Sequence, residues 1–250
     1  MPARRVSAAT VPIDDLIAYL FDGGQAGLAA EVRQRVTASR RFRAFAEAYR
    51  DKIRKKARGS RDDEAQRDLA FELAVAALIL DDGRFALEYE PYGVGQRAPD
   101  FRLTFRGGAR CNIEARRLRS VRAKSDAPLR AALTRSICDK LGQLPPGMMN
   151  VVALGIVDPS TAAPMLVAIM RELEVGAVAK DDARFRERGF SGARDFLRYY
   201  RRLSGVLWIS EGAPTQADLW RSPLARHPLA ADIGRALARL TYPAAEARRG

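Results

Sequence analysis

The sequence predicts an α/β protein with a mixed central sheet flanked by helices and a helical N-terminal extension. Apolar residues recur at helical spacing through residues 12–58, and short apolar segments alternate with helical patterns after residue 63. Two of the later segments are apolar throughout, as in strands covered on both faces. Neither an internal repeat nor a low-complexity linker stands out. We therefore expect a basic helical extension over residues 1–62 and one α/β domain over residues 63–250.

The helices of the extension and the first helix of the domain are predicted from apolar spacing. Residues 12–58 should form helices around a Gly23-Gly24 break, and they end in the basic run 52–56. From Asp62 a helix is expected to reach Leu80, and it is apolar on almost every side. A helix with that pattern is buried.

Three short segments with strand character follow, at residues 85–90, 100–105 and 111–118. Gly107-Gly108 lies between the last two and suits a hairpin turn, so these strands are expected to be antiparallel. An amphipathic helix should then begin at Asp126 and extend to Leu144, before a pair of prolines.

The rest of the chain continues this alternation. Apolar strands are predicted at residues 151–157 and 205–210, and helices at 162–174 and 231–240. Residues 178–202 interrupt the pattern, because they are polar and rich in arginine and aromatic residues. These aromatic rings could stack on nucleic-acid bases or cap the core, and we favour the cap.

The charge of the chain points to a polyanionic partner. The 250 residues include 43 Lys and Arg against 30 Asp and Glu, a net charge of +13. Residues 1–62 carry 14 basic and 7 acidic side chains, whereas residues 63–160 carry 14 and 13. We expect nucleic acid, DNA in the first place, as the partner. The excess is mainly arginine, which could also partly reflect codon usage.

Composition excludes several kinds of chemistry. Two cysteines and one histidine, His227, fall short of a disulfide framework, a four-ligand zinc site and most histidine-based catalysis. No apolar stretch approaches the roughly 20 residues of a membrane span, and the glycine loops of nucleotide-binding proteins are absent. The sequence thus predicts a cytoplasmic protein with no membrane attachment, whose chemistry rests on carboxylates.

Three acidic residues stand where acids are usually avoided. Glu72 lies inside the apolar helix, Asp100 begins the second strand, and Glu114 lies in the middle of the third. A buried carboxylate is unfavourable unless it is paired or binds a metal. Each also has a structural alternative. Glu72 could pair with a buried arginine, and Asp100 could cap a turn. Glu114 could face solvent on an edge strand.

The order of elements around these acids resembles the PD-(D/E)xK nuclease superfamily, which has the restriction-endonuclease-like fold. The resemblance covers residues 63–157 and is carried by Pro99-Asp100, the hairpin, and then Glu114-Ala115-Arg116. It implies a metal-dependent endonuclease that hydrolyses phosphodiester bonds in DNA. Asp100 and Glu114, together with a main-chain carbonyl, would then be ligands of Mg²⁺ or Mn²⁺.

The resemblance also implies roles for neighbouring residues. Glu72 would complete the shell of a second metal or orient the attacking water. Arg116 stands where the family has lysine; it would neutralise the phosphate, but it stays protonated and cannot act as a base. The lysine of this superfamily sometimes lies on a neighbouring element. Lys140 is then the candidate, with Gln143 one turn further along.

Basic side chains near the motif are expected to hold the nucleic acid. Residues 102–135 contain 10 basic and 2 acidic side chains, a balance that suits a phosphate backbone and makes binding sensitive to salt. The basic end of the extension could grip phosphates or form a solvated helix face. The predicted contacts are Arg117, Arg119, Arg122 and Lys124, together with Lys52, Lys55 and Lys56.

Arg116 leaves a second hypothesis open, a catalytically degenerate nuclease fold that binds nucleic acid or a partner without cutting it. A third hypothesis is an interaction protein whose acids form core salt bridges. A single catalytic site per chain would require a homodimer for double-strand cleavage. The sequence alone names no surface for such a dimer.

Overall fold

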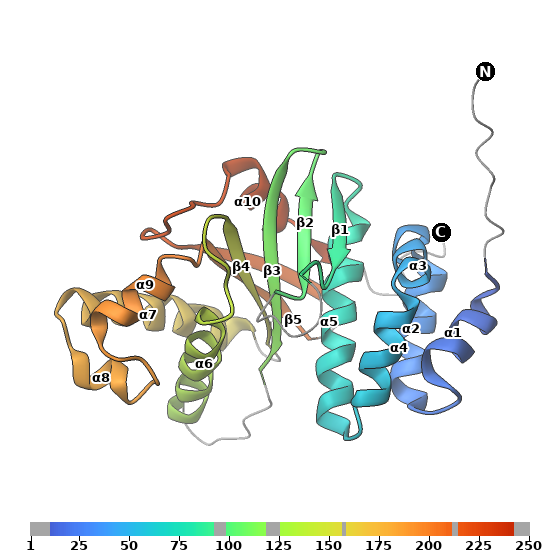
Figure 1. Ribbon diagram of the computed structural model, residues 1–250, viewed down its shortest axis with the longest axis horizontal. Helices are drawn as coiled ribbons and strands as arrows, with labels where there is room; N and C mark the ends of the chain where they lie inside the picture. The colour runs from blue at the N-terminus through green and yellow to red at the C-terminus, as the bar shows by residue number, and fades with distance from the viewer. Residues whose placement is uncertain (1–10, 93–98, 119–125, 157–158, 212–214, 243–250) are drawn as a thin grey trace. The chain divides into compact units, whose positions relative to one another are not determined.

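The chain forms two compact units, and the division between them falls within one helix. The units comprise Met1–Leu73 and Ala74–Gly250, a division that falls later in the chain than the boundary at residue 62 expected from the sequence. The fold is drawn in Figure 1. It comes from a computed structural model that describes residues 11–92, 99–118, 126–156, 159–211 and 215–242.

The first unit is helical, as the sequence predicts. Asp22 and Gly23 end the first helix with positive φ angles of 49° and 75°, which accounts for the break at the glycine pair. Leu20, Val32, Phe42 and Ile53 come from four different helices and are all fully buried, so these helices share one small core. The helices are α1 (Ile13–Phe21), α2 (Ala26–Ala38), α3 (Arg40–Ala48), α4 (Arg50–Gly59) and the first half of α5 (Asp63–Asp81).

The second unit is built on a mixed sheet of six strands, to which a two-residue strand is added at one edge. The strands lie side by side in chain order. The first three are antiparallel, the third to fifth are parallel, and the sixth is antiparallel to the fifth. They are β1 (Phe85–Tyr89), β2 (Phe101–Phe105), β3 (Ala109–Arg117), β4 (Met149–Ile156), β5 (Gly205–Ser210), β6 (Thr215–Arg221) and the short β7 (Thr241–Tyr242).

The sheet confirms the predicted hairpin and the five predicted strands, and it adds β6 and the two-residue β7. β2 and β3 are joined through Gly107, which has a φ of 75°. β6 is the longer of the two strands that were not expected from the sequence. Its residues Thr215–Arg221 are mostly polar and lie next to the end of the sheet.

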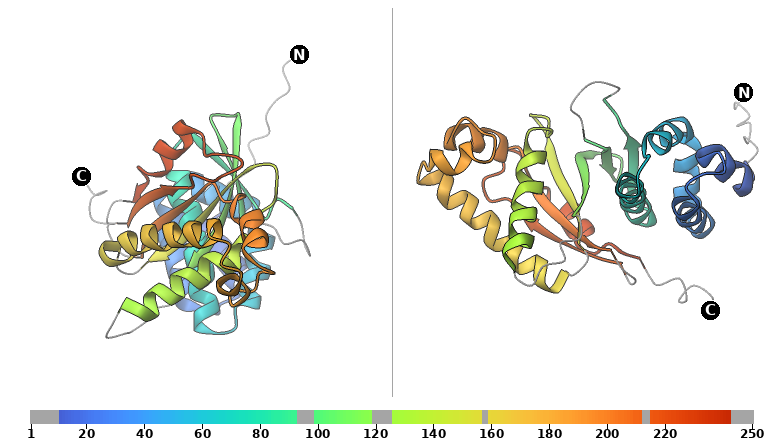
Figure 2. Two further views of the ribbon diagram at one scale, coloured as in Figure 1. Left: turned by 90° about the vertical axis from the view of Figure 1, so that its left-hand side faces the viewer. Right: turned by 90° about the horizontal axis from the view of Figure 1, so that it is seen from below.

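Helices α6 (Asp126–Leu141) and α7 (Pro159–Val178) cover one face of the sheet (Figure 2). Two crossovers follow one another in the same direction, from β3 through α6 to β4 and from β4 through α7 to β5, which places both helices on the same face. The core between these helices and the sheet contains Leu133, Ile137, Ile169, Leu173, Val152, Leu154, Val206 and Trp208. A last helix, α10 (Ala231–Leu237), contacts β6.

The arginine-rich segment between α7 and β5 contains two short helices, α8 (Asp182–Arg186) and α9 (Ala193–Tyr200). The rings of Phe185 and Phe196 stack with centroids 4.3 Å apart, and Tyr200 packs beside Phe196 at 5.1 Å. All three side chains are fully buried. The prediction that the aromatic residues of this segment cap the core is therefore confirmed for these three.

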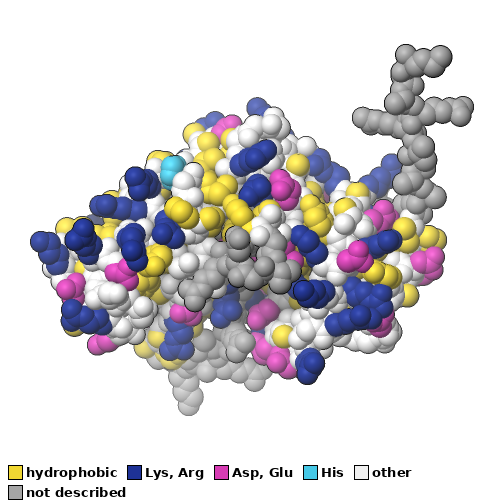
Figure 3. All heavy atoms as spheres, viewed as in Figure 1, with side chains coloured by type: hydrophobic (Ala, Val, Ile, Leu, Met, Phe, Trp, Pro, Cys, Tyr) yellow, Lys and Arg dark blue, Asp and Glu magenta, His cyan; other side chains and the backbone are white. Residues whose placement is uncertain are grey.

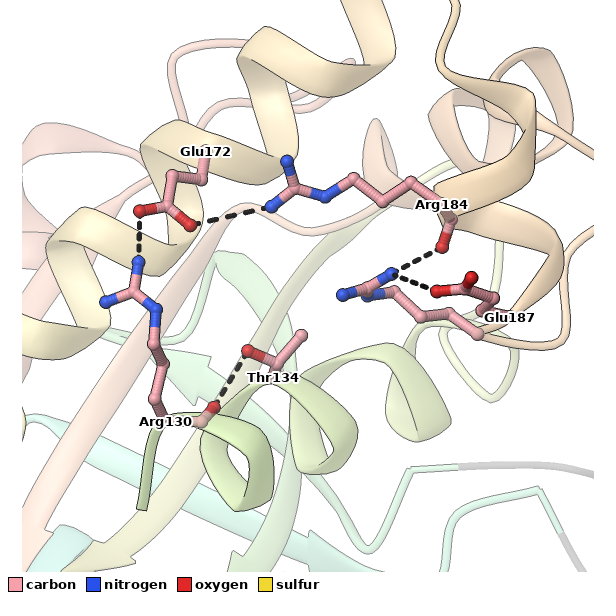
Figure 4. Close-up of polar contacts among 6 residues, drawn as sticks. Arg130, Thr134, Glu172, Arg184 and Glu187 are labelled. Carbon is pink, nitrogen blue, oxygen red and sulfur yellow. Dashed lines mark hydrogen bonds and ion pairs between the residues drawn. The ribbon is translucent and has the colours of Figure 1, made fainter. Parts of the chain in front are cut away.

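Ion pairs at the surface connect α8 to the helices of the face (Figure 4). Glu172 of α7 accepts hydrogen bonds from Arg130 of α6 and, at 3.5 Å, from Arg184 of α8. Arg188 donates to the carbonyl of Arg184. Because these groups are substantially exposed, each pair stabilises the fold by no more than about 1 kcal/mol.

A buried amide pair links the middle of the sheet to the segment before β5. Asn112 of β3 and Asn150 of β4 lie opposite one another, and neither has exposed surface. Asn112 Nδ2 donates to Asn150 Oδ1 at 2.9 Å. Asn150 Nδ2 lies 3.0 Å from the carbonyls of Pro145, Met148 and Arg202. Both side-chain amides are therefore satisfied, as burial requires.

Candidate functional site

The pairing of β2 with β3 ends at Phe101 and Ile113, and we call the point where the two strands separate the opening between β2 and β3. Phe101 lies opposite Ile113, so one further step along both strands sets Asp100 beside Glu114. β3 continues to Arg117 in its pairing with β4, whereas β2 has its first residue at Phe101. Glu114 therefore lies just past the end of the antiparallel β2–β3 pairing, at a point where the parallel β3–β4 pairing continues.

Asp100 bridges this opening with its side chain. Its Oδ2 accepts the backbone N–H of Ala115 at 2.9 Å, and its carbonyl accepts the N–H of Glu90 at 2.7 Å. The residue is partly exposed. The carboxylate of Asp100 thus contacts the backbone of the neighbouring strand β3. The residue it contacts, Ala115, directly follows Glu114.

Glu114 is buried inside the sheet. Its side chain is 3% exposed, and β3 lies between β2 and β4, so the alternative of a solvent-facing edge residue is wrong. Val152 of β4 lies opposite Glu114 and belongs to the core that α6 and α7 cover. A carboxylate at this depth requires a counter-charge.

Lys140 supplies that counter-charge from the last turn of α6. Its Nζ donates to Glu114 Oε1, and also to Gln143 Oε1 at 3.0 Å. Ser136 and Ile137 precede Lys140 by four and three residues and are buried, so this side of the helix faces the sheet. The lysine and glutamine expected from the sequence are thus brought together with Glu114.

Arg116 lies two residues beyond Glu114 on the same face of β3. Its Nε is buried and makes no hydrogen bond with any residue that the structure describes. A buried guanidinium nitrogen without a partner is unfavourable. Four other arginines of the described residues have an Nε in the same state, so this atom does not by itself indicate a ligand.

Glu72 belongs to the other compact unit. It lies on the first half of α5, and its Oε1 accepts a hydrogen bond from Lys56 Nζ of α4 at 2.7 Å. The side chains are 13% and 29% exposed, respectively. A lysine is thus one partner of Glu72, and Lys56 is engaged within the helical unit.

The other basic residues predicted to contact nucleic acid differ in their exposure to solvent. Arg117 is only 7% exposed at the end of β3, so little of its surface can meet a ligand. Lys55 is exposed on α4, and the ammonium of Lys52 lies 5.7 Å from the ring centroid of Tyr49. Arg119, Arg122 and Lys124 lie outside the described residues.

Sequence reasoning missed the polar side chains near the site. Asn112 precedes Glu114 by two residues on the same face of β3, and its Oδ1 accepts the hydroxyl of Tyr92 at 3.3 Å. The guanidinium of Arg102 lies 4.6 Å from the ring centroid of Tyr92. The signal for Asn112 was an amide two residues from an acid on the same strand.

The donor groups of the site are hard oxygens. Across the described parts of the chain, no three His, Cys, Asp or Glu side chains gather closely enough to hold a metal ion. The set at the opening of the sheet is therefore two carboxylates, from Asp100 and Glu114. The thiols offer no alternative nucleophile, because burial raises the pKa of Cys138 to about 12 and that of Cys111 still further.

Comparisons of this chain with protein-family models, with curated proteins and with solved structures found no match. None of the helices in the described ranges is both long and apolar enough to cross a membrane.

Proposed function

We propose that the chain is a metal-dependent, endonuclease-like enzyme that hydrolyses phosphodiester bonds in DNA at the opening between β2 and β3. One observation carries the proposal: Lys140 reaches Glu114 from a separate helix, beside Asp100. Two carboxylates and an ammonium group are the side chains that the resemblance to the PD-(D/E)xK superfamily requires. Here Asp100 directly precedes β2, Glu114 lies on β3, and Lys140 lies on α6.

The order of elements supports the restriction-endonuclease-like fold as part of this proposal. A helix, three antiparallel strands, a crossover helix and a parallel strand follow one another from α5 to β4. This is the order on which the resemblance rests. Asp100 directly precedes the second strand and Glu114 lies on the third, the positions that the resemblance assigns to the two acids.

The donor set fits a hard divalent cation. Mg²⁺ is commonly held by one or two carboxylates and keeps several water molecules. Asp100 and Glu114 would hold it, and a backbone carbonyl of β3 would contribute a further oxygen. When bound, Mg²⁺ or Mn²⁺ would polarise the phosphate and lower the pKa of a water molecule.

The chain's own cations act on the substrate. Arg116 donates hydrogen bonds to a phosphate oxygen and stabilises the negative charge that develops during hydrolysis. Lys140 is held by Gln143, so its ammonium stays near Glu114 and positions the attacking water. For Glu72 the proposed role is to complete the shell of a second metal ion or to orient that water.

Cleavage of plasmid and single-stranded DNA with Mg²⁺ or Mn²⁺ tests the proposal. Asp100→Asn and Glu114→Gln keep the shapes of the side chains but remove the charges that hold the metal, and each should abolish metal-dependent cutting. Glu88→Gln is the matched control, because Glu88 is an exposed acid on β1 of the same sheet. Cutting that survives both site substitutions would refute the proposal.

Glu72→Gln is a separate arm of this experiment. A fall in cleavage of about 100-fold without loss of folding would make Glu72 part of the site. Unchanged cleavage would leave Glu72 outside the site, in its ion pair with Lys56.

Arg116 favours a second candidate function, a nuclease fold that binds nucleic acid or a partner without cutting it. Arginine cannot take the role of a base. Wild-type chain that binds DNA tightly and never cuts it, with any metal, would support this candidate. If cutting does occur in both strands, the single site per chain predicts a homodimer, which sedimentation of the DNA complex would detect.

A further inference from the structure

A cluster of five arginines lies on and beside the arginine-rich segment, outside the candidate site. Figure 3 shows Lys and Arg side chains gathered on the side of the second unit that carries α8 and α9. We call the following group the α9 arginine patch: Arg194, Arg198, Arg201, Arg202 and Arg226.

The patch lies on the outer side of α9. Phe196 and Tyr200 fill the core from the inner side of the helix, while Arg194, Arg198 and Arg201 are exposed. Arg226 comes from the loop after β6, and its backbone N–H donates to the carbonyl of Arg201 at 2.7 Å. Two chain segments thus present one basic surface.

Within the described parts of the chain, most of this charge has no carboxylate partner. Arg198 is the member of the patch that forms an ion pair there, with Asp195 at 2.6 Å. Arg202 donates to the carbonyl of Leu144, which leaves its positive charge uncompensated. A group of guanidinium ions placed together is unfavourable unless an anion offsets their repulsion.

The ring of Tyr199 orders two members of the patch. The guanidinium groups of Arg198 and Arg202 lie 4.7 and 4.8 Å from its centroid. Such contacts hold long side chains in place before a ligand arrives, which lowers the entropy that binding must overcome. The patch is therefore partly preorganised.

We infer that the α9 arginine patch binds the sugar-phosphate backbone of double-stranded DNA, as a second contact surface apart from the opening between β2 and β3. The inference rests on the proposed function in taking DNA as the partner, but it requires neither metal nor cleavage. Guanidinium groups match phosphate oxygens with paired hydrogen bonds.

The dimensions of the patch fit this partner. Arg194 to Arg201 spans about seven residues of helix, about 10 Å at 1.5 Å per residue. Phosphates of one DNA strand follow one another at an axial rise of about 3.4 Å, so a row of this length along the duplex axis spans about three nucleotides.

The patch has a fixed position relative to the site. Asn150 Nδ2 is hydrogen-bonded to the carbonyl of Arg202, and Asn150 is paired with Asn112, two residues from Glu114. The patch thus keeps a constant position relative to the sheet that carries the acids.

Binding to a fluorescent DNA duplex in EDTA, measured by anisotropy over a range of salt concentrations, tests the inference without cleavage. The test variant is Arg194→Gln/Arg198→Gln/Arg201→Gln, which keeps Arg202 and its hydrogen bond to Leu144. The control removes three exposed arginines from α7, α10 and the residues after α10, as Arg171→Gln/Arg235→Gln/Arg239→Gln. Both variants change the net charge equally.

The test variant should bind at least about 10-fold more weakly at about 0.15 M salt, and the slope of log K against log salt should fall by about 2 to 3. The control should lose less than about threefold. Equal losses in the two variants, or an unchanged slope in the test variant, would overturn the inference. So would loss of binding to anionic phosphatidylserine vesicles with unchanged binding to DNA.

The inference and the proposed function fail in different ways. DNA binding that depends on the patch, with no cleavage in the presence of any metal, supports the inference about the patch and refutes the proposed enzyme activity. Cleavage that depends on Asp100 and Glu114, with DNA binding unaffected by the triple variant, supports the enzyme and refutes the role of the patch.

Discussion

Lys140 of α6 donates a hydrogen bond to the buried carboxylate of Glu114 of β3, although 26 residues separate them in the chain. The side chains are 14% and 3% exposed, so this is a largely desolvated ion pair. Its geometry places a fixed positive charge at one edge of the two-carboxylate set. The ammonium of Lys140 thus neutralises the same acid that the proposed cation would contact.

Replacing Lys140 tests that balance of charge. Lys140→Met removes the ammonium and leaves Glu114 buried without it, which should lower the free energy of unfolding by about 3 kcal/mol. Urea denaturation measures this change. Addition of Mg²⁺ should stabilise Lys140→Met more than it stabilises the wild type, because a bound cation takes over the neutralisation. The control is Lys180→Met, at an exposed lysine. Equal stabilisation of all three chains by Mg²⁺ would contradict the assignment.

Arg116 should matter for cleavage and little for stability. Its Nε has no hydrogen-bond partner within the described fold, so Arg116→Ala removes no internal contact of that group. Loss of a charge that stabilises the transition state should slow metal-dependent cleavage by about 100-fold or more. Single-turnover rates and thermal unfolding separate the two effects. A large fall in melting temperature with an unchanged rate would show instead that Arg116 is structural.

Arg116→Lys measures how the arginine at the motif position affects the rate of cleavage. Lysine can lose its proton and position water, so this variant should cut at least as fast as the wild type. The pH profile of the single-turnover rate is the readout. A rate as low as that of Arg116→Ala would show that the guanidinium geometry itself is required.

Phe196 supports the surface that carries the α9 arginine patch. It is fully buried and contacts the rings of Phe185, Phe190 and Tyr200. Phe196→Ala should destabilise the second unit by about 3 to 5 kcal/mol, because it removes a large core side chain and leaves a cavity. Phe196→Leu should lose less than about half as much in urea denaturation. Equal and small effects would mean that α9 is not packed on the core.

Cys138 should stay protonated in the folded chain. Burial raises its pKa from 9.0 to about 12, so the thiolate fraction near neutral pH is very small. Iodoacetamide should therefore react with Cys138 after unfolding and hardly before, as mass spectrometry of native and urea-treated samples would show. Because the unfolded thiol ionises at a pH near 9.0, its contribution to stability is present below that pH and is lost as the pH rises toward about 12. Rapid alkylation of the native chain would contradict this burial.

The strands that could be predicted from the sequence are those whose apolar pattern is set by the core. β5 matches the predicted residues 205–210, because every position but the last is buried. β6 escaped prediction because its sequence, TQADLWR, carries no sustained apolar alternation. Its pairing with β5 is what makes it a strand.

The candidate site could be predicted only in part. Asp100 and Glu114 stand out because acids are rare in such strands, and Lys140 followed from the resemblance. The pairing of Glu72 with Lys56 and the burial of Arg117 depend on contacts between distant segments, which local spacing does not encode. The arginine-rich segment combined a buried aromatic face with an exposed basic one, and the sequence alone did not separate these faces.

The amide pair between Asn112 and Asn150 has a consequence for how the chain reaches this arrangement. β4 is apolar and buried along almost its whole length, a pattern that does not by itself single out one alignment with β3. A slip of one residue would set Asn112 against Met149 or Val151, leave both amides buried without each other, and carry Glu114 away from Lys140. The two asparagines of the chain thus select one register during folding, and that selection brings an acid on β3 to its lysine on α6.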